Sequence, residues 1–176
     1  MTDSAALAVI LAHGAAGTSA SMRPHVDGLR RRGLEALAID LPKRNAEAAV
    51  GAYAAAVADL PASVIGGHSY GGRVASLLAA EQAPRGLVLL SYPLHRPGRT
   101  DWQPRTAHWP RIDCPALLLS GEADPFARIE LLRDAVRLLP QAELVTYPGL
   151  RHGLAGVLDD ALDRVASFVR ALERPA

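Results

Sequence analysis

The chain has 176 residues, 49% of them hydrophobic and 21% charged, which is typical of one globular domain spanning residues 1–176 and excludes wholesale disorder. Its formal net charge of +1 gives no reason to expect nucleic acid or a membrane surface as a partner. The single cysteine, Cys114, excludes an internal disulfide and a cysteine metal site, so a cytoplasmic protein is expected. The apolar run at 5–12 is too short to span a membrane and lacks the basic start of a signal peptide.

Short apolar runs recur along the chain, each about the length of a buried strand. They lie at 7–12, 34–39, 63–66, 86–90, 116–119 and 143–147. Stretches with helical spacing lie at 22–32, 47–59, 71–82, 127–139 and 154–172. This alternation predicts an α/β fold, a three-layer α/β/α sandwich with about six mostly parallel strands. Ligands of such sheets bind beyond the carboxyl ends of the strands, so the loops after the apolar runs are the candidates for a functional site.

The loop after the third run contains a serine between glycines. Residues 67–71 read Gly-His-Ser-Tyr-Gly, a G-x-S-x-G motif between a predicted strand and a predicted helix. The glycines permit a turn too sharp for side chains, which presents the Ser69 hydroxyl above the sheet, and the helix N-terminus favours a developing negative charge. The motif therefore predicts a nucleophile. The alternative is a glycine-rich turn with an incidental serine.

Two further loops carry an acid and a base. The fifth run is followed by Glu122 and Asp124, and the sixth by His152. A serine hydroxyl is a weak nucleophile that needs a base, itself oriented by an acid. Asp124 is favoured over Glu122 because it lies further from the strand and Pro125 rigidifies its loop. The alternatives are a helix N-cap for Asp124 and a surface histidine for His152.

The loop after the first run, residues 13–18, consists of small residues that leave backbone N–H groups exposed. We expect two amides to stabilise an oxyanion: that of Ala15, with Ala16 as second choice, and that of Tyr70, which follows the serine. His13 is expected to shape this loop instead of acting as a base. The alternative is a tight turn with no catalytic role.

Several segments carry a resemblance to a known family: LAHGAAG, GGHSYGGRVAS, LLSYPLHRPGR, PRIDCPALLLSGEADPF and GLRHGL. The chain resembles a small α/β-hydrolase without a cap domain, and more narrowly the testis-expressed and dienelactone-hydrolase-like group. The resemblance implies Ser69 as nucleophile, Asp124 as acid and His152 as base, with no cofactor and no metal. The sequence departs from it at residues 68–70, His-Ser-Tyr, where relatives often read Lys-Ser-Met or Arg-Ser-Met. It also lacks counterparts of the first two strands of the eight-stranded superfamily core.

Residues 91–115 connect the fourth and fifth runs and are too few for a helical lid. This connector carries both tryptophans and four arginines. We expect its aromatic side chains to form a wall of the substrate pocket, with arginine attracting a carboxylate. The residues expected in this wall are Tyr92, His95, Trp102 and Trp109. The alternative is a proline-rich loop whose tryptophans pin it to the body of the domain.

Together these residues predict a serine hydrolase that cleaves a small or accessible carboxylic ester or thioester through an acyl-enzyme. We expect a small-molecule acyl substrate, no nucleic-acid or membrane partner, and a monomer or homodimer. Two alternatives stay open. One is a catalytically silent scaffold for protein interaction, which the reactivity of Ser69 would distinguish. The other is acyl transfer or perhydrolysis by the same residues, which differs in how water is excluded.

Overall fold

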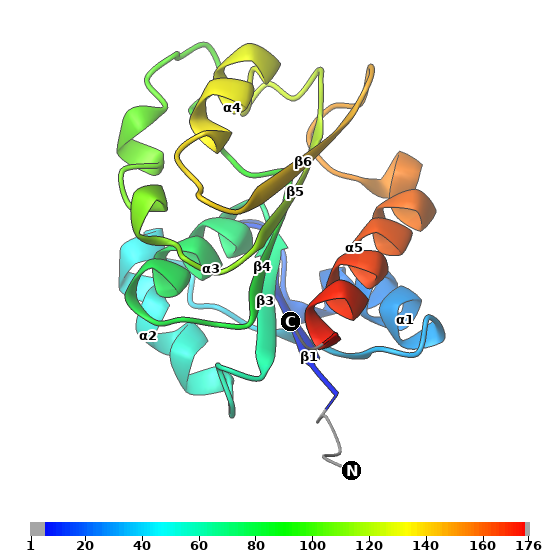
Figure 1. Ribbon diagram of the computed structural model, residues 1–176. Helices are drawn as coiled ribbons and strands as arrows, with labels where there is room; N and C mark the ends of the chain where they lie inside the picture. The colour runs from blue at the N-terminus through cyan, green and yellow to red at the C-terminus, as the bar shows by residue number, and fades with distance from the viewer. Residues whose placement is uncertain (1–5, 175–176) are drawn as a thin grey trace.

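The computed structural model describes residues 6–174 and contains one sheet of six parallel strands (Figure 1). The strands are β1 (Ala8–Ala12), β2 (Glu35–Ile39), β3 (Ser63–His68), β4 (Gly86–Leu90), β5 (Ala116–Gly121) and β6 (Ala142–Tyr147). Their order across the sheet is β2-β1-β3-β4-β5-β6, and every neighbouring pair is parallel. The predicted six-stranded α/β fold is confirmed. The strand order reverses between β1 and β3, which is where α/β sheets bind ligands.

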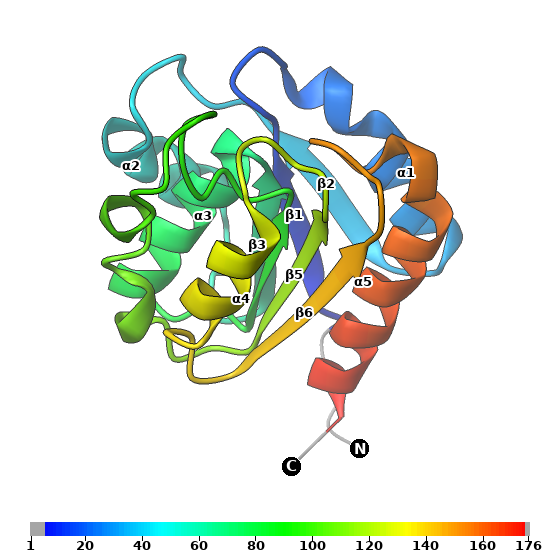
Figure 2. The same ribbon diagram turned by 90° about the horizontal axis from the view of Figure 1, so that it is seen from above.

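Helices cover both faces of the sheet (Figures 1 and 2). One face carries α1 (Arg23–Arg31) and α5 (Leu158–Glu173), and the other carries α2 (Ala46–Ala56), α3 (Tyr70–Glu81) and α4 (Ile129–Val136). Successive side chains of a strand point to opposite faces, so Ile10 packs in the core under α2 and α3, whereas Val9 and Leu11 pack in the core under α1 and α5. Over the described residues no cap domain lies above the sheet, so the loops at its carboxyl edge form the candidate site.

The sequence explains the start of α2 and the end of α1. Asn45 precedes α2, and its side chain accepts a hydrogen bond from the backbone N–H of Ala48 at 2.8 Å, which caps the helix. Gly33 follows the basic end of α1 and has a φ of +80°, a conformation that favours glycine. Across residues 6–174, none of the helices has the length and hydropathy that a bilayer crossing requires.

Two predicted helices begin later than expected. The helix predicted from residue 127 starts at Ile129, because the Asp124 carboxylate accepts a hydrogen bond from the backbone N–H of Phe126 in a tight turn instead of capping a helix. The helix predicted from residue 154 opens with a 3₁₀ turn at Ala155–Val157 and becomes α-helical at Leu158. Both delays occur in the loops that carry the predicted acid and base.

Candidate active site

Ser69 occupies a sharp turn between β3 and α3. Its φ of +49° and ψ of −113° lie outside the conformations that most residues adopt, as the motif predicts for an exposed hydroxyl. The flanking glycines are required for packing: a Cβ at Gly67 or at Gly71 would lie 2.4 Å from the carbonyl oxygen of Ala12, at the end of β1. The Ser69 N–H donates to the carbonyl of Leu90 at 2.8 Å, which fixes the turn to β4 as well.

Gly71→Ala is expected to destabilise the protein by about 1–3 kcal/mol, because the added methyl group must displace the backbone of β1. Gly51→Ala is the matched control: Gly51 is exposed within α2 and a Cβ there meets no atom within 4 Å. The control should stabilise the protein by about 0.5–1 kcal/mol. Urea unfolding of both variants measures these changes, and a neutral Gly71→Ala would contradict the steric explanation.

The carboxyl edge of the sheet brings together the three residues predicted as nucleophile, acid and base. His152 Nε2 lies 3.0 Å from Ser69 Oγ, and His152 Nδ1 lies 2.8 Å from Asp124 Oδ2. The Asp124 side chain is fully buried, and its other oxygen accepts the Phe126 N–H at 2.8 Å. An acceptor at Nδ1 places the imidazole proton there and leaves the Nε2 lone pair for the serine hydroxyl.

Glu122, the rival acid, lies elsewhere. Its carboxylate accepts the hydroxyl of Thr146 at 2.8 Å and pairs with Arg133 at 3.3 Å. Both contacts hold the side chain over β6 and α4. The geometry therefore favours Asp124 as the partner of His152.

The loop that carries His152 is held by contacts the sequence did not predict. The N–H of Gly153 donates to Ser91 Oγ at 3.2 Å. The ring of Phe126 lies 4.6 Å from that of His152. Ser91 is the first residue of the connector and has a φ of +50°. Its position directly after β4 was the available signal, since the residues that follow β1, β3, β5 and β6 had already been singled out as candidate site residues.

The predicted oxyanion loop follows β1. The N–H of Gly17 donates to the carbonyl of Gly14 at 2.9 Å and closes a turn whose central residues, Ala15 and Ala16, are exposed. The Tyr70 N–H belongs to the first residue of α3, and such an amide has no partner within its own helix. Both candidate donors thus lie in segments that border Ser69: the Tyr70 amide follows it directly, and the 13–18 loop leaves β1, the neighbour of β3.

His13 supports this loop, as expected. It is buried, and its Nε2 accepts the backbone N–H of Leu41 at 3.0 Å while Nδ1 lies 2.8 Å from the carbonyl of Gly14. Because Nε2 is the acceptor, Nδ1 is the donor. Both ring nitrogens are therefore engaged, and His13 joins the loops after β1 and β2 instead of serving as a base.

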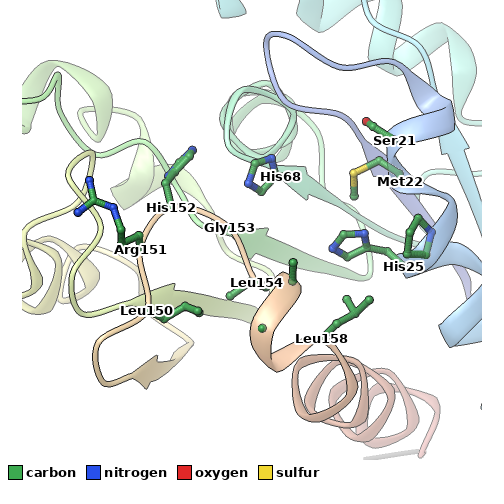
Figure 3. Close-up of a pocket in the computed structure, with 13 residues that line it drawn as sticks. Ser21, Met22, His25, His68, Leu150, Arg151, His152, Gly153, Leu154 and Leu158 are labelled. Atoms are coloured by element: carbon green, nitrogen blue, oxygen red, sulfur yellow. The ribbon is translucent and has the colours of Figure 1, made fainter.

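A cavity of about 560 Å³ opens beside His152. Figure 3 shows it between the segment that leads into α1 and the segment between His152 and α5. Its apolar walls include Met22, Leu150, Leu154 and Leu158, and two histidines, His25 and His68, also line it. These residues were not predicted as a pocket, although each lies close in the chain to a loop that was singled out.

The connector aromatics that the sequence predicts as a wall of the substrate pocket are not among the residues that line this cavity. Tyr92 and Trp109 are buried in the core, with ring centroids 5.0 Å apart, and the Tyr92 hydroxyl donates to a connector carbonyl at 2.6 Å. His95 is buried, and its Nε2 accepts the N–H of Arg128 at 2.9 Å. Trp102 is half-buried against the same core. We therefore assign all four side chains to anchoring the connector, the alternative that the sequence left open.

Buried histidines make the stability of the protein sensitive to acid. Burial lowers the pKa of His68 to about 4, with smaller contributions from the charges of His152 and His25, and burial also lowers the pKa of His108 to about 4. Their ordinary value is 6.5, so between pH 6.5 and pH 4 the unfolded chain binds more protons than the folded one. The free energy of unfolding should therefore fall as the pH is lowered through this window.

Each histidine contributes at most about 1.4 kcal/mol per pH unit to this slope. Urea unfolding at pH 7, 6 and 5 measures the slope, and His68→Gln should reduce it. A free energy of unfolding that stays constant from pH 7 to pH 5 would contradict the prediction.

Comparison with known proteins gives a family and a fold. A family described as an alpha/beta hydrolase domain matches residues 5–166. A search of the curated proteins found no match. Among solved structures, a Paleococcus ferrophilus monoacylglycerol lipase superposes with a TM-score of 0.82 at 15% identity, covering 94% of each chain. Est1E from Butyrivibrio proteoclasticus, bound to ferulic acid, superposes with a TM-score of 0.76 at 18% identity, covering 97% of this chain and 91% of its own.

A third similar structure is an alpha-beta serine hydrolase homologue from Coxiella burnetii. It has a TM-score of 0.76 at 16% identity, and the match covers 92% of this chain and 84% of that one. At these identities the structures demonstrate a shared fold. The narrower resemblance to dienelactone-hydrolase-like proteins stays a prediction.

Proposed function

This chain belongs to the α/β-hydrolase family, and from that premise we propose that it is a serine hydrolase that cleaves a small or accessible carboxylic ester or thioester. The observation that carries the proposal is the hydrogen-bonded series Asp124–His152–Ser69, with distances of 2.8 Å and 3.0 Å. Lipase and esterase structures among the similar folds support the same reaction class.

In the first half of the reaction, His152 Nε2 takes the proton of the Ser69 hydroxyl as the oxygen attacks the acyl carbonyl. Buried Asp124 holds the Nδ1 proton and stabilises the imidazolium that forms. The imidazolium then donates its Nε2 proton to the leaving alcohol or thiol. The products of this half are the free leaving group and an acyl-Ser69 ester.

The negative charge that develops on the carbonyl oxygen needs donors. The amides of Tyr70 and Ala15 are the proposed pair, and the N-terminus of α3 adds a favourable dipole. Loss of one such donor typically costs about 10²–10³-fold in rate. Ala16 is the second choice for the loop donor because it occupies the other central position of the same turn.

In the second half, His152 Nε2 removes a proton from water as the water oxygen attacks the acyl-Ser69 carbonyl. The bond between the acyl carbon and Ser69 Oγ then breaks, the imidazolium returns its Nε2 proton to Ser69 Oγ, and the carboxylic acid is released. Ser69 is partly exposed, and no cap domain covers it among residues 6–174. Water therefore has access to the acyl-enzyme, which favours hydrolysis over transfer to another acceptor. The adjoining cavity, with its largely apolar lining, is the proposed place for the bulk of the substrate.

A fluorophosphonate probe tests the proposal, because it reacts with serines that an adjacent base activates. The wild-type protein should be labelled at Ser69, and Ser69→Ala should not be labelled. Labelled protein would then be assayed on ester and thioester panels of varied acyl length. A folded wild-type protein that resists the probe would refute the enzyme proposal and favour the interaction scaffold.

A further inference from the structure

A second cavity, of about 270 Å³, lies between the first turns of α3 and the connector. Four arginines line it: Arg73 from α3, and Arg96, Arg99 and Arg105 from the connector. Among the described residues that line this arginine cavity, Asp101 is the only acidic one. Guanidinium groups repel one another, so a cavity that collects four of them is typical of a site for an anion.

The arginine cavity is separate from the apolar cavity described above. The connector packs against α3 on the face of the sheet that also carries α2, whereas the apolar cavity adjoins α1 and α5 (Figures 1 and 2). Arg73 follows Ser69 by one helical turn, and its backbone N–H donates to the Ser69 carbonyl at 3.0 Å. The arginine cavity therefore lies at the same edge of the sheet as Ser69 but on the opposite face from the apolar cavity.

The charges around the cavity do not balance. Arg73 pairs with the Glu47 carboxylate of α2, and Arg99 Nε lies 3.2 Å from Asp101 Oδ1. Four guanidinium groups thus face two carboxylates, which leaves two positive charges without a counterpart in this set of described residues. Both of these carboxylates are also exposed, so water screens the pairs that they form.

Arg105 has donors to spare. Its Nη1 donates to the carbonyl of Pro93 at 2.7 Å, and within residues 6–174 no partner is present for its Nε and Nη2. Neither atom is fully buried, so both can reach a ligand. Burial lowers the pKa of the Arg105 guanidinium, and the charges of Arg73 and Arg96 lower it further. A bound anion would offset this repulsion and accept the two free donors.

The number of charges and donors favours phosphate over carboxylate. A carboxylate has one negative charge and two oxygens, which the fork of a single arginine can satisfy. A phosphate monoester carries nearly two negative charges at neutral pH and three terminal oxygens, so it can accept bonds from several guanidinium groups at once. A cavity of about 270 Å³ would hold several water molecules of about 30 Å³ each, so it has room for a phosphate group.

We propose that the arginine cavity binds a phosphate group, either inorganic phosphate or the phosphate of a small monoester. Arg96, Arg99 and Arg105 are the proposed ligands. Arg73, which is already paired with α2, adds positive charge. This site does not rest on the proposed hydrolysis at Ser69.

The first test compares three anions by isothermal titration calorimetry at low ionic strength: inorganic phosphate, phenyl phosphate and benzoate. At least one of the two phosphates should bind with a Kd of about 1 mM or lower, as two or three charge-assisted hydrogen bonds provide, and more tightly than benzoate. Tighter binding of phenyl phosphate would identify a monoester site, and tighter binding of inorganic phosphate a site for the free ion. Weaker binding of both, or benzoate binding as tightly, would overturn the proposal.

Variants locate the bound phosphate. Arg105→Gln should weaken binding by about tenfold or more, and Arg105→Lys, which keeps the charge but not the fork, should restore part of it. Arg96 and Arg99 are exposed, so the double variant Arg96→Gln with Arg99→Gln should weaken binding and keep the thermal unfolding midpoint.

Arg111→Gln is the matched control, because Arg111 is an exposed arginine of the same connector outside the described lining of the cavity. It removes the same charge and should keep the wild-type Kd. Wild-type affinity in both the folded Arg105→Gln variant and the double variant would overturn the assignment. An equal loss of affinity in Arg111→Gln would do the same, because binding would then follow net charge alone.

Ser69→Ala separates this site from the candidate active site. The variant should bind phosphate as tightly as the wild type, since the cavity does not use the Ser69 hydroxyl. Loss of binding in Ser69→Ala would place the anion at the active site and overturn the proposal. If no ester were hydrolysed but phosphate binding still depended on Arg105, the arginine site would stand and the proposed hydrolase function would not.

Discussion

Ser69→Ala is expected to reduce kcat for ester hydrolysis by about 10⁶-fold, to the level that binding and oxyanion stabilisation alone provide. The alanine removes the attacking oxygen and leaves no group that can form the acyl-enzyme. The fold should be retained, because the contact that fixes the turn to β4 is made by the backbone N–H of residue 69, not by its side chain. Initial rates with a 4-nitrophenyl ester and the thermal unfolding midpoint measure both effects.

If the folded Ser69→Ala variant still hydrolysed the ester at more than about a hundredth of the wild-type rate, the nucleophile would lie elsewhere, since loss of a true nucleophile lowers the rate far more.

Ser91 provides the informative comparison. It also has a positive φ at the carboxyl edge of the sheet, but its hydroxyl accepts the N–H of Gly153. Ser91→Ala should weaken activity through the position of His152 and should keep probe labelling at Ser69.

Asp124→Asn is expected to lower kcat by about 10⁴-fold with little change in the fold. The amide is the same size as the carboxylate, but it can present an N–H to His152 Nδ1, which then reverses the tautomer and removes the lone pair from Nε2. The charge that stabilises the imidazolium is lost as well. The buried position of Asp124 makes both losses severe, because solvent cannot replace either.

Glu122→Gln is the matched control for this experiment. It lies two residues from Asp124 and makes the same chemical change, but its carboxylate contacts Thr146 and Arg133 and not His152. Its rate should stay within a few-fold of the wild type. If Glu122→Gln were the more damaging variant, the acid would have to be reassigned to Glu122.

The sequence was enough to determine the strand–helix alternation and the residues of the candidate site, for local physical reasons. Strands that are covered by helices on both faces appear in the sequence as continuous apolar runs. A strand-to-helix turn that holds its serine at a positive φ requires small residues on either side of the serine. A Cβ at either Gly67 or Gly71 would clash with the carbonyl oxygen of Ala12, so both glycines of the G-x-S-x-G motif are needed at this turn. Parallel connectivity then places every strand end at one edge, so Ser69, Asp124 and His152 could be expected to meet there.

Only the tertiary structure decided which side chains surround these three residues. Tyr92 and Trp109 are aromatic residue types that are common in pocket walls. In this structure they pack against each other and against the core, and they do not line the cavity. The cavity instead forms where the start of α1, with Met22 and His25, faces the segment before α5, with Leu154. These segments lie near opposite ends of the chain, and sequence periodicity predicts which face of an element is buried but not which distant element packs against it. Long-range packing therefore decided where the pocket lies, whereas the candidate nucleophile, acid and base could be predicted from local sequence pattern.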